Sequence, residues 1–330
     1  MGRHRKSGKH LPQRMYHQHG GYYFVDHSGK WNNLGRSYPD ALRNLAVLVG
    51  DAGSLNTMNG VFDRYALEVI PTKAPRTQID YRKQLPLLRA VFGEVPPREI
   101  TATHIFECRN KRGQQSVVQA NREKSLLSSV MTKAIEWGAV SHNPCKQVPR
   151  LAEKKRERYI ADDEYSSVHA LATPMIQIAM DLALLTGLRQ GDLLGLEKRH
   201  VTEEGIDIVT AKTNKRLIIE WSAELRAVID RAFGISPRVR QFVICNLQGK
   251  RYTSDGFRTM WDRLMRKAAE SKVITARFTF HDIRAKSLSD DSAAAATIRS
   301  GHTDPKVTNS IYRRKPTRAR PLDRTKPQEY

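Results

Sequence analysis

The chain of 330 residues has few of the features that mark secreted or membrane proteins. Its three cysteines, Cys108, Cys145 and Cys245, lie far apart and form no C-x-x-C pair, which argues against disulfides and against a zinc site. No apolar run reaches the length of a membrane span, and the N-terminus lacks the apolar core of a signal peptide. We therefore expect a soluble protein of the cytoplasm with no membrane partner.

Acidic residues are also scarce. The chain has 34 Asp and Glu against 56 Lys and Arg, which gives a formal net charge of +22 at pH 7. Such an excess of positive charge favours a polyanionic partner, most simply nucleic acid, over an acidic small molecule. A metal-dependent nuclease would need a cluster of carboxylates, and none accompanies the basic motifs described below. The sequence thus predicts a nucleic-acid-binding protein and disfavours a metal-dependent nuclease.

The C-terminal stretch 281–314 gathers side chains suited to chemistry on a phosphodiester, namely His281, Arg284, His302 and Tyr312. A phenol with a pKa of about 10 needs nearby cations or a base to become a nucleophile. The phosphoryl group in transit also needs fixed donors to stabilise its negative charge. Each residue has a structural interpretation as well. His281 could be a satisfied histidine at a helix start, and Tyr312 a half-buried aromatic.

Two earlier segments supply further cations. In the stretch 181–201, Gly187 predicts the end of a helix, and Leu188-Arg189 then begins a short helix with Asp192 three residues on. This spacing places both side chains on one face, so that Asp192 could hold the guanidinium of Arg189 in place. The alternating stretch 206–221 predicts a β-hairpin with Lys212 at its tip.

In this order, the motifs resemble those of the tyrosine recombinases, also called the phage integrase family. The resemblance covers about the second half of the chain. It implies that Arg189 and Arg284 clamp the scissile phosphate and that His302 donates to it. Lys212 would protonate the leaving 5′ oxygen.

The same resemblance assigns the remaining side chains. Tyr312 would be the nucleophile, His281 would assist proton transfer, and Asp192 matches the acidic position that supports the first arginine. The competing nucleophile is Tyr330, the last residue, but the sequence provides no helix to hold it.

Residues 1–55 open with a basic arm and then predict a small sheet around Tyr22–Val25 and a helix over 39–49. They resemble the arm-type DNA-binding domain of lambda-type integrases. A disordered tail over residues 1–15 and a histidine metal site are the alternatives. The arm residues that we expect to contact DNA are Arg3, Arg5, Lys6 and Lys9.

Residues 56–150 predict four helices, over 59–70, 76–92, 100–113 and 116–138, the last one stopped by His142-Asn-Pro144. The resemblance implies that they form a core-binding (SAM-like) domain. The charged stretch 151–164 predicts a basic linker to the catalytic domain, residues 165–330, which includes a helix over 254–269 and a basic tail after Tyr312. Further residues expected to contact DNA are Lys154, Lys155, Arg156, Arg313 and Arg314.

We therefore expect a mainly α protein with small β elements (α+β). The resemblance implies a site-specific recombinase that requires no metal and no other cofactor. It would act as a homotetramer on double-stranded DNA with core and arm attachment sites, in the nucleoid of a bacterial host. A host DNA-bending protein and an excisionase are further expected partners. A type IB topoisomerase is the nearest rival, and the arm-type domain argues against it. A DNA-binding regulator without catalysis is the other, and no motif is missing to support it.

Overall fold

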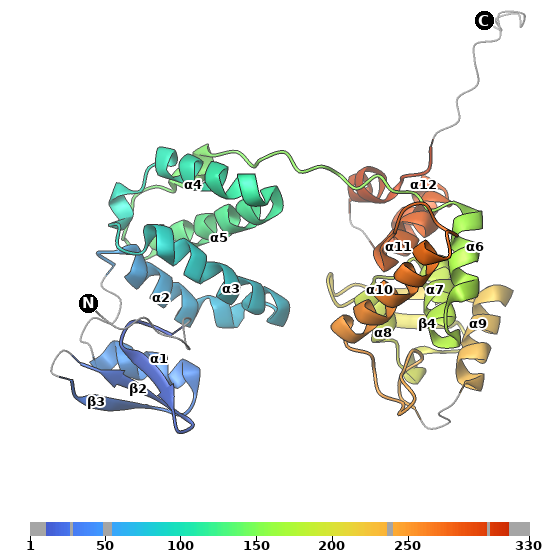
Figure 1. Ribbon diagram of the computed structural model, residues 1–330, viewed down its shortest axis with the longest axis horizontal. Helices are drawn as coiled ribbons and strands as arrows, with labels where there is room; N and C mark the ends of the chain where they lie inside the picture. Colours follow the sequence, from blue (N-terminus) through green and yellow to red (C-terminus); the bar gives the residue numbers. More distant parts are fainter. Residues whose placement is uncertain (1–10, 27–28, 49–54, 236–239, 302–303, 317–330) are drawn as a thin grey trace, which may run out of the picture. The chain divides into compact units, whose positions relative to one another are not determined.

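A computed structural model describes residues 11–26, 29–48, 55–235, 240–301 and 304–316 (Figure 1). It divides the chain into an N-terminal unit, Met1–Lys154, and a C-terminal unit, Lys155–Tyr330. Both units are mainly helical and each carries one small antiparallel sheet. This confirms the fold class expected from the sequence. The basic arm residues Arg3, Arg5, Lys6 and Lys9 and the competing Tyr330 lie outside the described residues.

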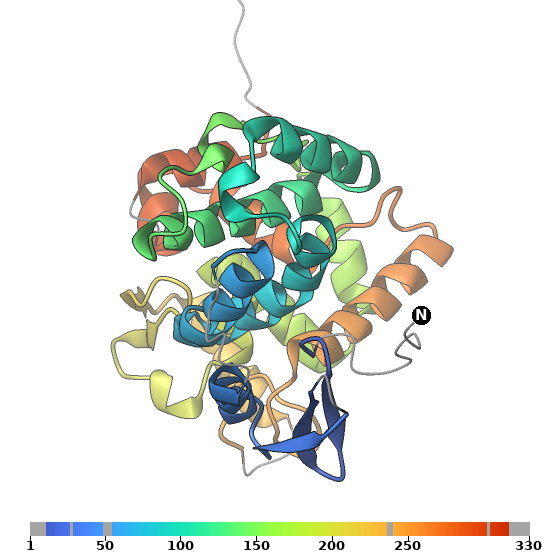
Figure 2. The same ribbon diagram turned by 90° about the vertical axis from the view of Figure 1, so that its left-hand side faces the viewer.

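The N-terminal unit begins with a three-stranded sheet, β1 Met15–Gln18, β2 Gly21–Val25 and β3 Trp31–Gly35, followed by α1 Tyr38–Leu48 (Figure 2). The β1–β2 loop is the pair His19-Gly20, and both residues have positive φ, as a tight hairpin turn with the right twist requires. One face of the sheet packs on α1 through a core of its own: Leu11, Met15, Phe24, Leu34, Ala41 and Leu42. The predicted sheet and helix are confirmed over the described residues.

Four further α-helices complete this unit: α2 Met58–Glu68, α3 Pro75–Phe92, α4 Ala102–Gln115 and α5 Val117–Glu136. They bury a second apolar cluster, to which α5 contributes Leu126, Leu127, Val130 and Ala134. The predicted end of α5 was wrong. The helix stops at Glu136 because Gly138 has a φ of 75°, and the Ala139 N–H then bonds to the Ala134 carbonyl at 2.9 Å. The Asn143-Pro144 pair opens a separate short turn, η3 Pro144–Gln147.

The linker from residue 151 to residue 161 contains neither helix nor strand. It is three residues shorter than predicted, because α6, Asp162–Leu171, already begins at the acidic triplet. Negative charge in the first turn of a helix is favourable to the helix dipole, which explains why these acids start a helix.

The C-terminal unit is built around α7, Pro174–Thr186, whose side chains are buried on most sides: Met175, Ile176, Ile178, Ala179, Met180, Leu182, Ala183 and Thr186. A helix that is apolar nearly all round belongs at the centre of a domain. The elements around it are α8 Gln190–Leu194, β4 Gly205–Val209, β5 Arg216–Glu220, α9 Ala223–Gly234, α10 Ser254–Glu270 and α11 Phe280–Ser289. The chain then forms α12 Ala293–Ser300, α13 Pro305–Val307 and the π-helical turn η5 Thr308–Tyr312.

Three aromatic rings fix the start of α11 against α10. Phe280 meets Phe257 edge-on at 4.8 Å and Trp261 at 5.2 Å between ring centroids, and the Trp261 indole N–H donates to the Phe278 carbonyl. Aromatic packing against α10 therefore holds the start of the helix that carries the predicted H-x-x-R motif.

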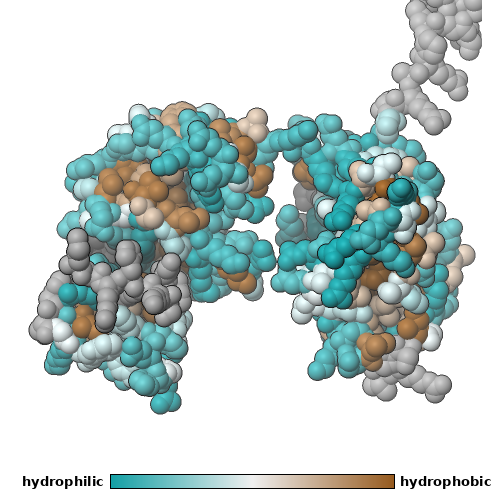
Figure 3. Space-filling view, in the orientation of Figure 1, coloured by the Kyte–Doolittle hydropathy of each residue, from teal (hydrophilic) through white to brown (hydrophobic). Residues whose placement is uncertain are grey.

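In Figure 3, hydrophilic side chains cover most of the visible face of the C-terminal unit. Over the described part of the chain, no helix has the length and hydropathy to cross a membrane.

Candidate active site

Arg284 lies on α11 with only 2% of its surface exposed. Its guanidinium donates to two backbone carbonyls, through Nη1 to Gly187 at the end of α7 and through Nη2 to Ser300 at the end of α12, the latter at 3.0 Å. Gly187 ends α7 with a φ of 63°, and a Cβ at that position would lie 3.2 Å from the Ser287 hydroxyl. The glycine therefore lets the carbonyl reach Arg284, and two helix ends hold the guanidinium in one orientation.

Tyr312 packs into the space next to Arg284. Its side chain is 7% exposed and lies in a small apolar cluster with Ala285, Leu288 and Ala296. The guanidinium carbon of Arg284 lies 5.0 Å from the centroid of the Tyr312 ring. Its backbone is held too, because the Ser289 hydroxyl donates to the Tyr312 carbonyl at 2.7 Å.

His281 also packs against the tyrosine. It lies in the first turn of α11, and its ring meets Tyr312 edge-on at 5.6 Å between centroids. The structural interpretation of a helix-start histidine thus describes its position correctly, but His281 also contacts the predicted nucleophile. His281, Arg284 and Tyr312 are brought together as the sequence motifs predict.

Two pKa shifts suit these residues to proton transfer and charge stabilisation. Part of the His281 surface is exposed, but the protein around the ring shields it from water, and this loss of solvation lowers its pKa. The positive charges of Arg284, Arg314 and Arg189 lower the pKa further. The imidazole is therefore neutral at pH 7 and can accept a proton. Burial also lowers the pKa of Arg284, an effect that the neighbouring Tyr312 opposes.

Arg189 precedes α8 in an extended conformation, with φ −71° and ψ 148°, and does not begin the helix as predicted. Arg189 lies close enough to Arg284 and His281 for its positive charge to lower the pKa of both side chains. Its Nη1 is buried and has no hydrogen-bond partner within the described part of the protein. Such a donor is available to an anionic ligand.

Asp192 takes a different contact from the one expected. Among the described residues it forms no ion pair with Arg189, because the extended backbone at Arg189 removes the helical i,i+3 geometry. Its Oδ1 instead accepts the Ala211 backbone N–H at 2.9 Å. Asp192 thereby ties α8 to the turn of the hairpin.

Lys212 lies in that turn, between β4 and β5, which pair in the predicted antiparallel hairpin. The side chain is exposed, and no described contact joins it to Arg284 or Tyr312. The hydroxyls of Thr210 and Thr213, 2.8 Å apart, brace the turn on either side of it. His302 lies outside the described residues, directly after Gly301, which ends α12 with a φ of 65°.

Three of the basic residues expected on DNA are engaged within the protein. Arg156 makes two-pronged contacts to Asp282, with distances of 2.6 to 3.0 Å, and Arg314 contacts the same carboxylate at 2.7 Å. Arg313 donates to the Asp291 carbonyl. The linker residue Lys154 is exposed, as is Lys155.

Sequence reasoning missed the carboxylate at the centre of these contacts. The side chain of Asp282 is 0% exposed. Burial alone would raise its pKa, but hydrogen bonds from Arg156, Thr279 and Arg314 lower it to about 2. The Thr279-x-x-Asp282 spacing of a capping box was a visible signal for its role at the helix start, whereas its two arginine partners had no local signal.

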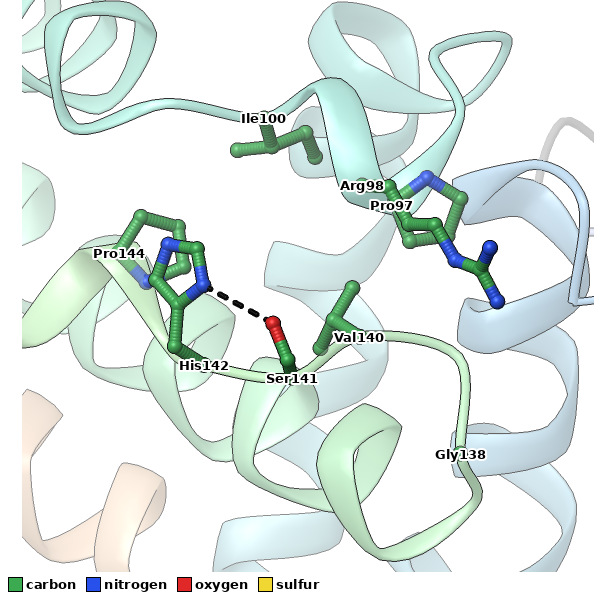
Figure 4. A pocket seen from close by; sticks show the side chains of 8 residues that line it. All are labelled: Pro97, Arg98, Ile100, Gly138, Val140, Ser141, His142 and Pro144. Atoms are coloured by element: carbon green, nitrogen blue, oxygen red, sulfur yellow. Dashed lines mark hydrogen bonds between the residues drawn. The ribbon is translucent and has the colours of Figure 1, made fainter.

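A hollow of about 410 Å³ in the N-terminal unit is a competing candidate site (Figure 4). Ser141 and His142 line it, with the hydroxyl oxygen 3.3 Å from Nδ1 of the imidazole. The lining residues include no carboxylate that could orient the histidine, so the pair lacks the third member of a hydrolytic triad. In the described residues, no three His, Cys, Asp or Glu side chains gather as metal ligands would.

Comparison with known proteins identifies the family of the C-terminal half of the chain. The phage integrase family matches residues 150–318. The integrase of Escherichia phage HK022 is 26% identical over 69% of this chain and 70% of its own length, and that of Escherichia phage lambda is 24% identical over the same shares.

Solved structures extend the similarity of fold to almost the whole chain. A lambda integrase dimer bound to a COC′ core site covers 98% of this chain and 100% of its own, with a TM-score of 0.69 and 20% identity. A lambda integrase tetramer bound to a Holliday junction covers 89% of this chain and 97% of its own, with a TM-score of 0.65 and 22% identity.

Proposed function

Because the chain belongs to the phage integrase family, we propose that Tyr312 is the nucleophile with which it cleaves and rejoins DNA as a site-specific tyrosine recombinase. The observation that carries this assignment is the packing of both His281 and Arg284 against Tyr312, with 5.6 Å between the His281 and Tyr312 ring centroids and 5.0 Å from the Arg284 guanidinium carbon to the Tyr312 centroid. A base and a fixed cation beside a phenol are what a tyrosine nucleophile needs.

In the proposed reaction the phenolic oxygen of Tyr312 attacks the scissile phosphorus while the bond to the 5′ oxygen breaks. The phenolic proton passes to the neutral imidazole of His281, and the leaving 5′ oxygen takes a proton from Lys212. The product is a 3′-phosphotyrosyl link and a free 5′-hydroxyl. The reverse step, with the 5′-hydroxyl of a partner duplex as nucleophile, releases the tyrosine. One phosphodiester replaces another, so no nucleotide cofactor is consumed.

Arg284 and Arg189 would stabilise the negative charge of the phosphoryl group in transit. The two carbonyls that hold Arg284 orient it before DNA arrives, so that little reorganisation is needed during the reaction. The unpartnered Nη1 of Arg189 would gain its hydrogen bond from a phosphate oxygen. We propose that His302, the residue after Gly301, adds a further donor.

The partner is double-stranded DNA, and the protein acts as an oligomer on it. We propose that residues 1–55 bind arm sites, that the α2–α5 helices within 56–150 bind core sites, and that the C-terminal unit cleaves. The similar lambda structures, a dimer on a core site and a tetramer on a Holliday junction, support a tetramer here. A host bending protein, an excisionase and a place in the bacterial nucleoid belong to the same proposal. The topoisomerase and regulator alternatives are not favoured, since the similar proteins are integrases and recombinases.

The test is the Tyr312→Phe variant on a suicide substrate nicked near the crossover. The variant keeps the ring that packs on Ala285 and Leu288, so it should fold and bind DNA like the wild type. It should form no covalent protein–DNA band on a denaturing gel. A covalent band of wild-type intensity would show that another residue attacks.

A further inference from the structure

The linker is anchored at both ends, within each unit separately. On its N-terminal side, the buried Asn121 side chain bonds to the backbone of Leu151 through both its oxygen and its nitrogen, each at 2.9 Å, and to Glu153 at 2.7 Å. The next residues, Lys154 and Lys155, are exposed and make no hydrogen bond or ion pair with another described residue. Only these two residues thus separate the part of the linker bound to the N-terminal unit from Arg156.

On its C-terminal side, the linker is bound to α11. Arg156 forms its two-pronged ion pair with the buried Asp282, and the Tyr159 hydroxyl donates to Asp290 at 2.5 Å. Ile160, next along the chain, is fully buried. This segment therefore belongs to the C-terminal unit from Arg156 onward, although it has no regular secondary structure.

The segment that follows Tyr312 uses the same two carboxylates. Arg314 contacts Asp282 at 2.7 Å and donates to the carbonyl of Arg158 in the linker at 3.2 Å. Lys315 contacts Asp290 at 2.8 Å. The linker and the tyrosine segment thus lie side by side on α11 and share Asp282 and Asp290 as partners.

We propose that Arg156 is a positioning residue for the nucleophile, which it serves by fixing Asp282 and, through it, Arg314 and the backbone of Tyr312. This inference rests on the proposed role of Tyr312 and adds the linker to that site. Arg314 is joined to Tyr312 by two further bonds at 2.7 Å, since its backbone N–H donates to the Ser289 hydroxyl, which itself donates to the Tyr312 carbonyl. Loss of Arg156 leaves a buried carboxylate short of one cation, which changes the geometry of the remaining partners.

The arrangement also has a consequence for communication between the two units. Lys154 and Lys155 are the only residues between the two anchors, so the connection between the units is short. Movement that draws Arg156 away from Asp282 would loosen the tyrosine segment. The position of Tyr312 would then depend on how the DNA holds the N-terminal unit.

The test uses the full chain and compares Arg156→Gln with Arg231→Gln. Arg231 is a matched control because it also pairs with an aspartate, Asp181, and its loss removes the same charge far from α11 in the sequence. Single-turnover cleavage of the suicide substrate is measured at saturating DNA, so that weaker binding does not lower the measured rate. A misplaced nucleophile lowers this rate, and we expect a loss of about tenfold or more for Arg156→Gln and none for Arg231→Gln.

A second readout follows Tyr312 directly. Hydrogen exchange of the amides in 308–315 should be faster in Arg156→Gln than in the wild type, while that of α10 is unchanged. Tyr159→Phe, which removes only one hydroxyl, should show the same changes in weaker form and guards against misfolding of the first variant. Arg156→Lys cannot reproduce the two-pronged contact and should restore the rate only in part.

The outcomes separate this inference from the assignment of Tyr312. If wild type forms the covalent band and Tyr312→Phe does not, yet Arg156→Gln cleaves saturating DNA as fast as Arg231→Gln, the positioning role is refuted. Arg156 would then be a phosphate contact if only affinity had fallen. If the wild-type band persists in Tyr312→Phe, the assignment of the nucleophile itself is wrong.

Discussion

Replacing Asp282 with Asn should weaken α11 in a way that depends on pH. The donors around this carboxyl hold its pKa at about 2, against an ordinary value of 3.8. Since one pKa unit corresponds to about 1.4 kcal/mol, the charged form stabilises the fold by about 2 to 3 kcal/mol at neutral pH. A group with a lowered pKa in the folded state gives its full stabilisation above the unfolded pKa. This contribution is therefore complete above about pH 4 and is lost as the pH falls toward 2.

Hydrogen exchange of the amides in α11 measures this contribution within the intact chain. At pH 7 they should exchange on the order of 100-fold faster in Asp282→Asn than in the wild type, and the difference should shrink between pH 4 and pH 3. Asp255→Asn is the control, because that carboxylate is 82% exposed and its pair with Arg258 contributes little. Equal exchange at pH 7, or a difference that stays constant down to pH 3, would refute the reasoning.

Three further predictions concern the reaction and the domains. Arg189→Ala should lower the cleavage rate by about two decades or more, measured with excess EDTA, in which wild-type cleavage should continue because fixed cations do the work of a metal. Because the pKa of His281 is lowered, the wild-type rate should reach half its maximum at a pH below the ordinary histidine value of 6.5, whereas a rate that halves at 6.5 or above would contradict this role. A protein beginning near residue 56 should cleave core DNA but fail to recombine full attachment sites, and its affinity should depend less on salt than that of the full chain.

The helices and the hairpin could be predicted because their signals are local. The alternating pattern of 206–221 predicted β4 and β5, and the apolar spacing of 254–269 predicted α10. Periodicity and turn residues are signals that extend over only a few neighbouring positions. The end of α5 was predicted wrongly because two local signals compete. Gly138 adopts positive φ and ends the helix before the chain reaches Pro144, whose presence suggested a later stop.

The site was predicted in part. The proximity of His281, Arg284 and Tyr312 could be predicted because they stand in recognisable motifs. The contacts of Asp282 could not, because Arg156 lies 126 positions earlier and Arg314 lies 32 positions later in the chain. Only the folded backbone brings such side chains together, and no periodic pattern encodes their meeting.

The identity of the residue that carries the DNA tests the central claim most directly. The wild-type covalent complex is trapped on a suicide substrate, digested with trypsin and nuclease, and sequenced by mass spectrometry. The account predicts one modified peptide with the nucleotide on Tyr312, linked through a 3′-phosphate, and a cleaved strand with a free 5′-hydroxyl. A nucleotide on Tyr330 or any other residue, or a link to the 5′ end, would contradict it.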